Sequence, residues 1–124
     1  ARAALEHAIA YSKERIQGGK PIAEHQSVKA RLFRMFAKFE AARSLARRVA
    51  VFNAANVPQV EYSIATKVFC TTTAFEVASE AVQIFGGNGL SREYPVEKLL
   101  RDARASMIED GCNEMLSLIG GSRL

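Results

Sequence analysis

Hydrophobic residues recur along the chain every three to four positions, the spacing of one face of an α-helix, and strand-like alternation is nearly absent. The first residues in this register are Leu5, Ala8, Ile9, Ser12 and Ile16. They predict a helix that ends at Gly18-Gly19, because glycine commonly terminates helices. Pro21 lies just beyond and cannot continue a helix.

Two long helices are predicted in the middle of the chain, on either side of Pro58. The first runs from about Glu24 to Asn56, and the second from about Gln59 to Phe85. The apolar stripe of the first consists of Leu32, Met35, Phe36, Phe39, Ala42, Leu45, Ala46, Val49 and Ala50. The stripe of the second consists of Ile64, Val68, Phe75, Ala78, Val82 and Phe85. Threonine is a weak helix former, so the run at residues 71–73 needs support from tertiary contacts.

Two shorter helices follow the glycine-rich stop at residues 86–89. One opens at Pro95 and reaches about Ala103, and the other covers about Met107 to Ile119. Short connections favour antiparallel packing of consecutive helices. The sequence therefore predicts an all-α fold, an up-down antiparallel four-helix bundle with a short extra helix, in a single domain over residues 1–124.

The composition limits the kinds of site that the chain can contain. The chain has 124 residues, 48% of them hydrophobic, which is enough for one packed core. Cys70 and Cys112 do not make a disulfide framework, and no Cys/His cluster is spaced for a metal, so we expect reduced thiols and no metal site. No apolar run approaches the length of a membrane span, and no signal peptide opens the chain, so we expect no membrane contact.

Charge is distributed unevenly between the two halves of the chain. Residues 1–50 contain 11 Lys/Arg and 4 Glu, whereas residues 51–124 contain 6 Lys/Arg and 9 Asp/Glu. A basic half is compatible with a nucleic acid, or with a solvated helix surface that makes a few phosphate contacts. No recognition motif or aromatic platform for nucleic acid is present, so the second interpretation is preferred.

Three segments resemble motifs of the acyl-CoA dehydrogenases. Residues 81–89 read AVQIFGGNG and resemble the family's AVQ-hydrophobic-x-GG-x-G motif. Residues 93–103 read EYPVEKLLRDA and resemble its EYPVE(K/R)…RDA segment. Residues 11–22 read YSKERIQGGKPI, similar to YxxxRxQFGxPI, and lead to His25-Gln26. The motifs occur in order, with family spacing, over nearly the whole chain.

The resemblance implies the C-terminal helical domain of an FAD-dependent enzyme that removes hydrogens from the α and β carbons of an acyl-CoA. Family members place a helical domain and a β-domain before this bundle, and neither is present in these 124 residues. We therefore expect the C-terminal part of a longer chain, and the 124 residues alone are expected to be inactive. A fragment, a solitary domain and a truncated product all remain open.

Asp110 is the catalytic candidate. In many family members the base that takes the α-proton is the Glu of an I-x-E-G-T motif. Counting from Arg101 without a gap places Asp110 at the position of this Glu. Gly111 then matches the glycine of the motif, and Cys112 matches the threonine. Aspartate moves the carboxylate by about 1.5 Å, a C–C bond length. A base also needs burial, because an exposed carboxylate with a pKa of about 4 is too weak. Glu109 is the second choice, and capping of the last helix is the structural alternative for Asp110.

The resemblance also implies FAD contacts, made to the FAD of a neighbouring subunit. Arg15 matches an arginine near the pyrophosphate, and a guanidinium suits phosphate geometry. The other predicted cofactor residues are Gln83, Gly86, Gly87, Cys112 and Glu114. A surface ion pair remains the alternative for Arg15, and a plain helix stop for the two glycines.

Several residues depart from the family pattern. Gly18 replaces an aromatic residue, Cys112 replaces a threonine that would hydrogen-bond the flavin, and the carboxylate of Glu114 stands where a polar residue contacts the cofactor. A relative that retains the fold as a binding or assembly domain, without dehydrogenation, is therefore the alternative function. Arg101 and Asp102 are expected to form a structural ion pair.

The resemblance finally implies the partners and the location of the protein. These are an acyl-CoA substrate, a homo-oligomer (dimer or tetramer) and an electron-transferring flavoprotein. The expected location is the cytoplasm of a bacterium or archaeon, or the mitochondrial matrix of a eukaryote.

Overall fold

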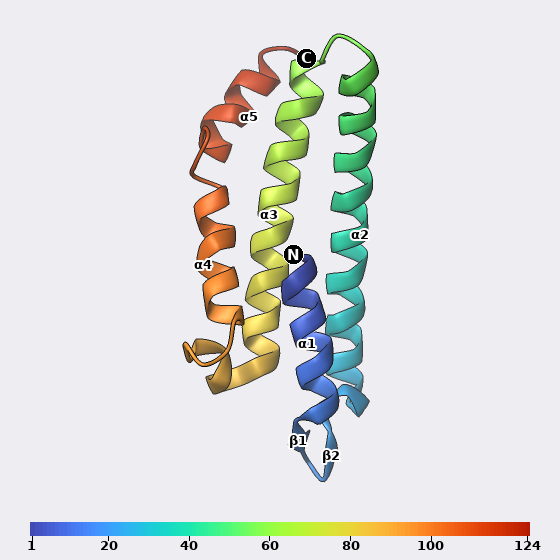
Figure 1. The fold of residues 1–124 in the computed structure, drawn as a ribbon, viewed down its shortest axis with the longest axis vertical. Coiled ribbons are helices and arrows are strands. Elements are labelled where there is room, and N and C mark those ends of the chain that lie inside the picture. Colours follow the sequence, from blue (N-terminus) through green and yellow to red (C-terminus); the bar gives the residue numbers. More distant parts are fainter.

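The computed structural model describes all 124 residues and contains five helices. These are α1 (Arg2–Glu14), α2 (Gln26–Ala55), α3 (Val60–Phe85), α4 (Val96–Ser106) and α5 (Asn113–Gly121). Consecutive helices alternate in direction from α1 to α4, and α5 continues beyond α4 (Figure 1). The predicted all-α, up-down bundle is confirmed.

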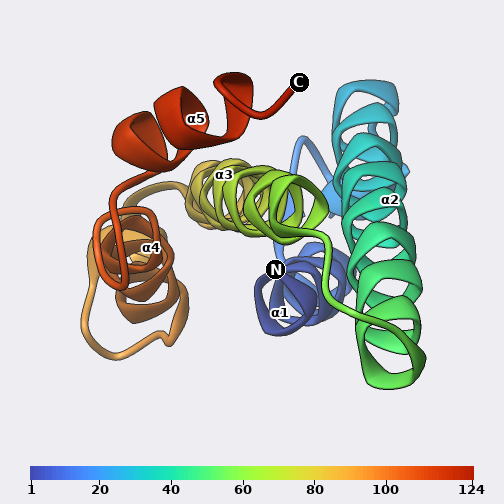
Figure 2. The same cartoon turned by 90° about the horizontal axis from the view of Figure 1, so that it is seen from above.

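Helix α3 is the centre of the bundle and contacts the other four helices. Viewed from above, α1 and α2 lie on one side of it, and α4 and α5 on the other (Figure 2). The 12 residues of its main core cluster are Ala4, Leu5, Ala8, Ile22, Met35, Val77, Ala78, Ala81, Ile84, Phe85, Val96 and Ala103. The α3 members of this cluster lie between Val77 and Phe85, so it fixes the C-terminal end of α3, beside which the candidate pocket lies.

The basic and acidic halves of the chain meet where α2 packs on α3. Arg31 donates to Glu80 at 2.5 Å, and Lys38 donates to Glu76 at 2.7 Å. All four side chains are partly exposed, so the free-energy contribution of each pair is small, about 0–1 kcal/mol. The excess positive charge of the first half is therefore partly neutralised inside the domain.

The segment after α1 differs from the prediction. The helix ends at Glu14 rather than at Gly18-Gly19, and β1 (Ile16–Gln17) pairs antiparallel with β2 (Lys20–Pro21). Gly18 and Gly19 form the turn at φ of 62° and 78°, a conformation that suits a tight hairpin. The 3₁₀ turn η1 (Ile22–Glu24) then leads into α2.

The last helix also differs from the prediction, because it begins at Asn113 and not near Met107. Asp110 has a φ of 55° and Gly111 a φ of 94°, and two consecutive left-handed residues cannot belong to a right-handed helix. Cys112 is the N-cap residue of α5, so the capping alternative for Asp110 is wrong.

The helices are not long and apolar enough to span a membrane. No group of three or more His, Cys, Asp or Glu side chains is arranged to hold a metal ion.

Candidate cofactor pocket and base loop

The turn that follows α3 exposes its backbone. It is the 3₁₀ segment η2 (Gly86–Leu90), which begins with Gly86 at φ 62° and ψ −138°. A methyl group placed on Gly86 or Gly87 would meet no atom within 4 Å. A ligand can therefore approach the main chain here.

The end of α1 holds this turn in place. The ring of Tyr11 stacks on Phe85, with centroids 4.0 Å apart, and Tyr94 packs against both rings edge-on. The side-chain amide of Asn88 donates to the hydroxyl of Tyr11 at 3.0 Å and lies 3.4 Å from the hydroxyl of Tyr94. The hydroxyl of Tyr11 lies 3.4 Å from the carbonyl oxygen of Phe85.

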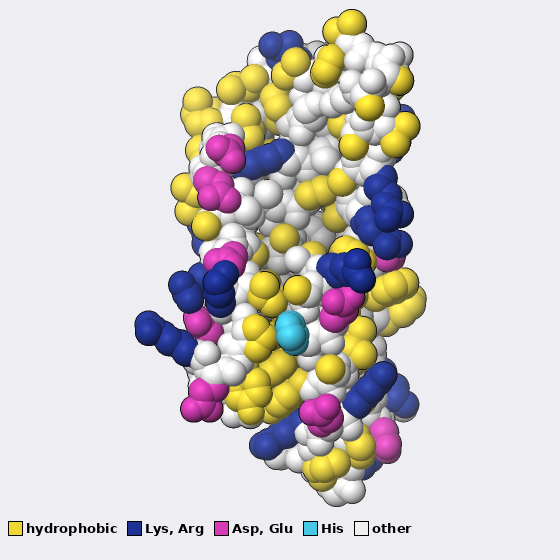
Figure 3. Space-filling view, in the orientation of Figure 1, with side chains coloured by type: hydrophobic (Ala, Val, Ile, Leu, Met, Phe, Trp, Pro, Cys, Tyr) yellow, Lys and Arg dark blue, Asp and Glu magenta, His cyan; other side chains and the backbone are white.

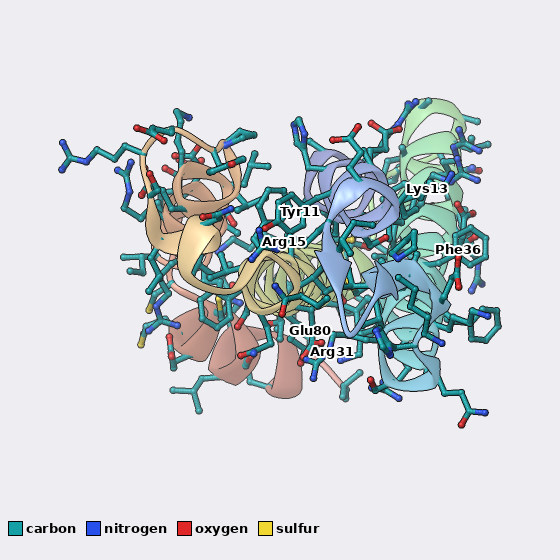
Figure 4. All side chains as sticks on the ribbon, turned by 90° about the horizontal axis from the view of Figure 1, so that it is seen from below. Tyr11, Lys13, Arg15, Arg31, Phe36 and Glu80 are labelled. Carbon is teal, nitrogen blue, oxygen red and sulfur yellow. The ribbon has the colours of Figure 1, made fainter.

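A pocket of about 410 Å³ lies between the end of α1 and this turn. Its walls are formed by Tyr11, Arg15, Gln17, Ile22, Ile84, Phe85, Gly86, Gly87 and Asn88. Figure 4 shows Tyr11 and Arg15 together at this junction. Arg15 is exposed and forms no ion pair, so the surface ion pair considered for it is absent. A free guanidinium beside open glycine backbone suits a phosphate group.

The structure places the predicted cofactor residues in three locations. Arg15, Gly86 and Gly87 line the pocket, whereas Gln83 is exposed on the last turn of α3 and does not. Cys112 and Glu114 lie at the start of α5, next to Asp110 in the chain.

Asp110 lies in the connection between α4 and α5, which we call the base loop (residues 107–112). Asp110 is exposed, as is Glu109, so the domain by itself does not desolvate either carboxylate. The base loop is tied to the N-terminal third of α3, because Lys67 Nζ donates to the carbonyl oxygen of Gly111 at 2.7 Å. Lys67 and Phe85 are about five helical turns apart, roughly 27 Å at ~1.5 Å per residue. The pocket and the base loop are therefore separate sites on one domain.

The ion pairs of α4 are not the predicted Arg101–Asp102 pair. Arg101 donates to Glu97 at 2.9 Å and 3.1 Å, and Lys98 pairs with Asp102. Residues four apart share one helix face, whereas adjacent residues do not, which explains the difference. The hydrogen bond from Arg101 lowers the pKa of the Glu97 carboxyl below its ordinary value.

All 124 residues match the family model described as acyl-CoA dehydrogenase, C-terminal domain. The chain belongs to this family. It is 42% identical, over 119 residues, to an acyl-CoA dehydrogenase of Bacillus subtilis, covering 96% of the chain and 31% of the relative. The chain therefore spans about a third of the length of the curated relatives that it matches.

Solved acyl-CoA dehydrogenase structures share the fold. Butyryl-CoA dehydrogenase from Megasphaera elsdenii superposes with a TM-score of 0.95 at 39% identity, covering 98% of this chain and 32% of that one. A glutaryl-CoA dehydrogenase of Mycobacterium smegmatis, solved in complex with FADH2, has a TM-score of 0.94 at 24% identity, with the same coverage of both chains.

Four residues that organise the two sites were not among the sequence candidates. They are Tyr11, Asn88, Lys67 and Asn113. Lys67 and Thr71 are four residues apart in α3, a spacing that places both on one helix face, whereas Tyr11 lies in α1 and Arg15 just beyond its end. Their long-range partners lie 41 to 77 positions away in the chain, so these contacts carry no local signal.

Proposed function

We propose that this chain is the C-terminal domain of an FAD-dependent dehydrogenase that introduces an α,β double bond into an acyl-CoA thioester. Membership of the acyl-CoA dehydrogenase family over the whole chain is the observation that carries the proposal. We propose that the complete protein includes further domains, a proposal supported by relatives that are about three times as long as this chain. The activity belongs to the complete protein.

The residues around the pocket fit the diphosphate of FAD. Arg15 supplies an unpartnered guanidinium, and Gly86 and Gly87 leave open backbone beside it. Bound FAD would supply the acceptor for the hydride that leaves the β carbon. The role of Arg15 is to neutralise phosphate charge, and the turn held by Tyr11 and Asn88 sets the distance at which the main chain meets the cofactor.

Asp110 acts as the base that removes the α-proton. Its carboxylate oxygen takes the proton, and the electron pair of the C–H bond remains on the substrate. Because Asp110 is exposed in this domain, the substrate and the rest of the protein must cover it to make it basic enough. A carboxylate shortened by one methylene suits an acyl group that lies closer to the loop, such as a branched or cyclic one.

The full-length protein tests both roles with two variants and two neighbouring controls. Wild-type protein should be yellow and should bleach anaerobically when an acyl-CoA is added. Asp110→Asn should keep its FAD and lose at least about a hundredfold in bleaching rate, a typical value for general-base catalysis. Arg15→Gln should lose FAD on gel filtration.

The controls Glu109→Gln and Lys13→Gln remove equal charges next to the two sites and should behave as wild type. Loss of bleaching in Glu109→Gln, with Asp110→Asn active, would move the base to Glu109. Colourless wild-type protein would overturn the FAD proposal.

The alternative suggested by the residues at positions 110 and 112 is a relative that binds ligands without dehydrogenating them. The matches to acyl-CoA dehydrogenases over the whole chain do not favour it. Such a protein would bind FAD and acyl-CoA, and its flavin would stay oxidised on mixing.

The proposed partners follow from the same function. A flavin reduced by substrate needs an electron acceptor, for which we propose an electron-transferring flavoprotein. Cofactor contacts across subunits require a homo-oligomer, either a dimer or a tetramer. The proposed location is the bacterial or archaeal cytoplasm, or the mitochondrial matrix.

A further inference from the structure

The base loop is held to α3 by a single lysine. Lys67 Nζ donates to the carbonyl oxygen of Gly111 at 2.7 Å and to Oδ1 of Asn113 at 2.9 Å. Gly111 directly follows Asp110, so the first bond fixes the peptide group one residue from the carboxylate. Figure 1 shows α4 and α5, which the base loop joins, on the same side of α3, and both helices contact α3.

Asn113 completes this arrangement from the other side of the loop. Only 7% of Asn113 is exposed, and its Nδ2 lies 3.0 Å from Oγ1 of Thr71 and 3.3 Å from Oγ1 of Thr72. Its backbone N–H donates to the carbonyl oxygen of Met107 at 3.0 Å, which closes the base loop on itself. The threonine run of α3, unfavourable for a helix, therefore supports the base loop.

The backbone that these bonds hold is in a rarely populated conformation. Asp110 has a φ of 55°, which side-chain-bearing residues seldom adopt, and Gly111 has a φ of 94°. Strained residues persist only where their surroundings determine the conformation. A side chain on Gly111 would also lie 3.3 Å from Leu116, so the loop is confined on both sides.

Lys67 makes no ion pair, unlike the lysines at positions 38 and 98. Its ammonium group is directed at neutral oxygen atoms, one of them in the base loop and one in Asn113, the first residue of α5. Charge-assisted hydrogen bonds of this kind are stronger than neutral ones. The two hydrogen bonds of Lys67 are therefore suited to orienting the base loop.

We infer that Lys67 is a positioning residue, which sets the direction of the Asp110 carboxylate by holding the carbonyl group of Gly111. This rests on the proposed role of Asp110 as the base. A change of about 1 Å in the position of a reacting group can lower a rate about a hundredfold. Loss of the Lys67 bonds therefore reduces kcat without removing substrate or FAD.

The test uses the full-length protein. Lys67→Met removes both hydrogen bonds and keeps the length of the side chain, and Lys67→Arg restores a cationic donor. Lys98→Met is the control, because Lys98 is an exposed lysine on α4 that pairs with Asp102. We expect Lys67→Met to lower kcat about a hundredfold, with KM and FAD content within about twofold of wild type. Lys67→Arg should recover at least about tenfold of the lost kcat, and Lys98→Met should match wild type.

Three results would overturn the inference. They are an unchanged kcat in Lys67→Met, a raised KM at constant kcat, and a fall in kcat that follows loss of FAD or of folded protein. If Lys67→Met gives no soluble protein, Lys67→Leu takes its place under the same criteria, because leucine also has no hydrogen-bond donor.

Asp110→Asn, measured in parallel, separates this inference from the proposed function. If Asp110→Asn is inactive and Lys67→Met is fully active, only the inference fails. If Asp110→Asn has wild-type kcat, the proposed base is wrong as well.

Discussion

Gly89 lies against the last turn of α3, in a position with no room for a side chain. A methyl group there would be 2.5 Å from the carbonyl oxygen of Val82 and 3.0 Å from Cβ of Phe85. Because two of the three close atoms belong to the backbone of Val82, the helix itself would have to shift. We expect Gly89→Ala to lower the free energy of unfolding by about 1–3 kcal/mol, the usual cost of overpacking. Urea titration followed by circular dichroism measures this.

Gly87 provides the matched control in the same turn. A methyl group there would meet no atom within 4 Å, and its φ is not positive. We expect Gly87→Ala to change the unfolding free energy by less than about 0.5 kcal/mol, as for most exposed sites. In the full-length protein the same methyl group should weaken FAD retention, because it occupies the open backbone beside Arg15. Equal losses of stability in Gly89→Ala and Gly87→Ala would contradict the close packing of Gly89 against α3.

For single residues, the sequence predicted a place in the site only where the residue belongs to a local motif. Arg15, Gly86 and Gly87 come from two such motifs and line one pocket. Gln83 comes from the same motif as the glycines, but the helix turns it away from the pocket walls. Its cofactor role, like that of Cys112 and Glu114, stays a prediction. The hydrogen bonds of Lys67 depend on a loop conformation that no local pattern specifies.

The junction between α1 and the turn η2 depends on the hydroxyl of Tyr11. This hydroxyl accepts from Asn88 at 3.0 Å, and the ring stacks on Phe85. Tyr11→Phe keeps the stacking and removes the hydrogen bond, so we expect a loss of about 0.5–1.5 kcal/mol of unfolding free energy. Tyr62→Phe is the control, because the exposed hydroxyl of Tyr62 makes no hydrogen bond and its ring contact with Arg48 is retained. Equal stability of Tyr11→Phe and wild type, by urea titration, would show that the hydroxyl does not join the two elements.

Long helices could be predicted from the sequence, and short irregular elements could not. The ends of α2 and α3 lie within about two residues of the prediction, because proline and glycine mark them. The hairpin at residues 16–21 has strands of two residues, too short to show alternation. Helix α5 begins later than predicted because Asp110 has a left-handed backbone conformation. The sequence does not reveal this, because aspartate also occurs in helices.

Over the whole molecule, the unequal charge of the two halves has a structural explanation. The basic residues of α2 face acidic residues of α3 in two ion pairs, so part of the charge excess is matched within the fold. The remaining excess of positive charge lies on exposed positions. One of these cations, Arg15, lines the pocket beside η2. This arrangement favours contact with a small phosphate-bearing ligand over an extended polyanion.

Large apolar side chains remain on the surface of the domain. Phe33 and Phe36 of α2 are 70% and 48% exposed and lie close together, with ring centroids 6.4 Å apart. Phe36 points to the outer side of α2 in Figure 4, and hydrophobic side chains also lie open over α5 and the adjacent helix ends in Figure 3. Monomeric proteins rarely expose large contiguous apolar patches.

We therefore expect the 124-residue chain, which has its own core, to self-associate in solution. Burial of one phenylalanine contributes about 1.5–3 kcal/mol, so the double variant Phe33→Ser/Phe36→Ser should weaken association by at least about tenfold. Sedimentation velocity over a concentration series measures this, and circular dichroism checks that helix content is retained. Val57→Ser is the control, because Val57 is 86% exposed but lies in the connection between α2 and α3, away from the two phenylalanines. If the double variant and the control associate as strongly as wild type, this face of α2 is not the contact, and the apolar surface over α5 becomes the one to vary.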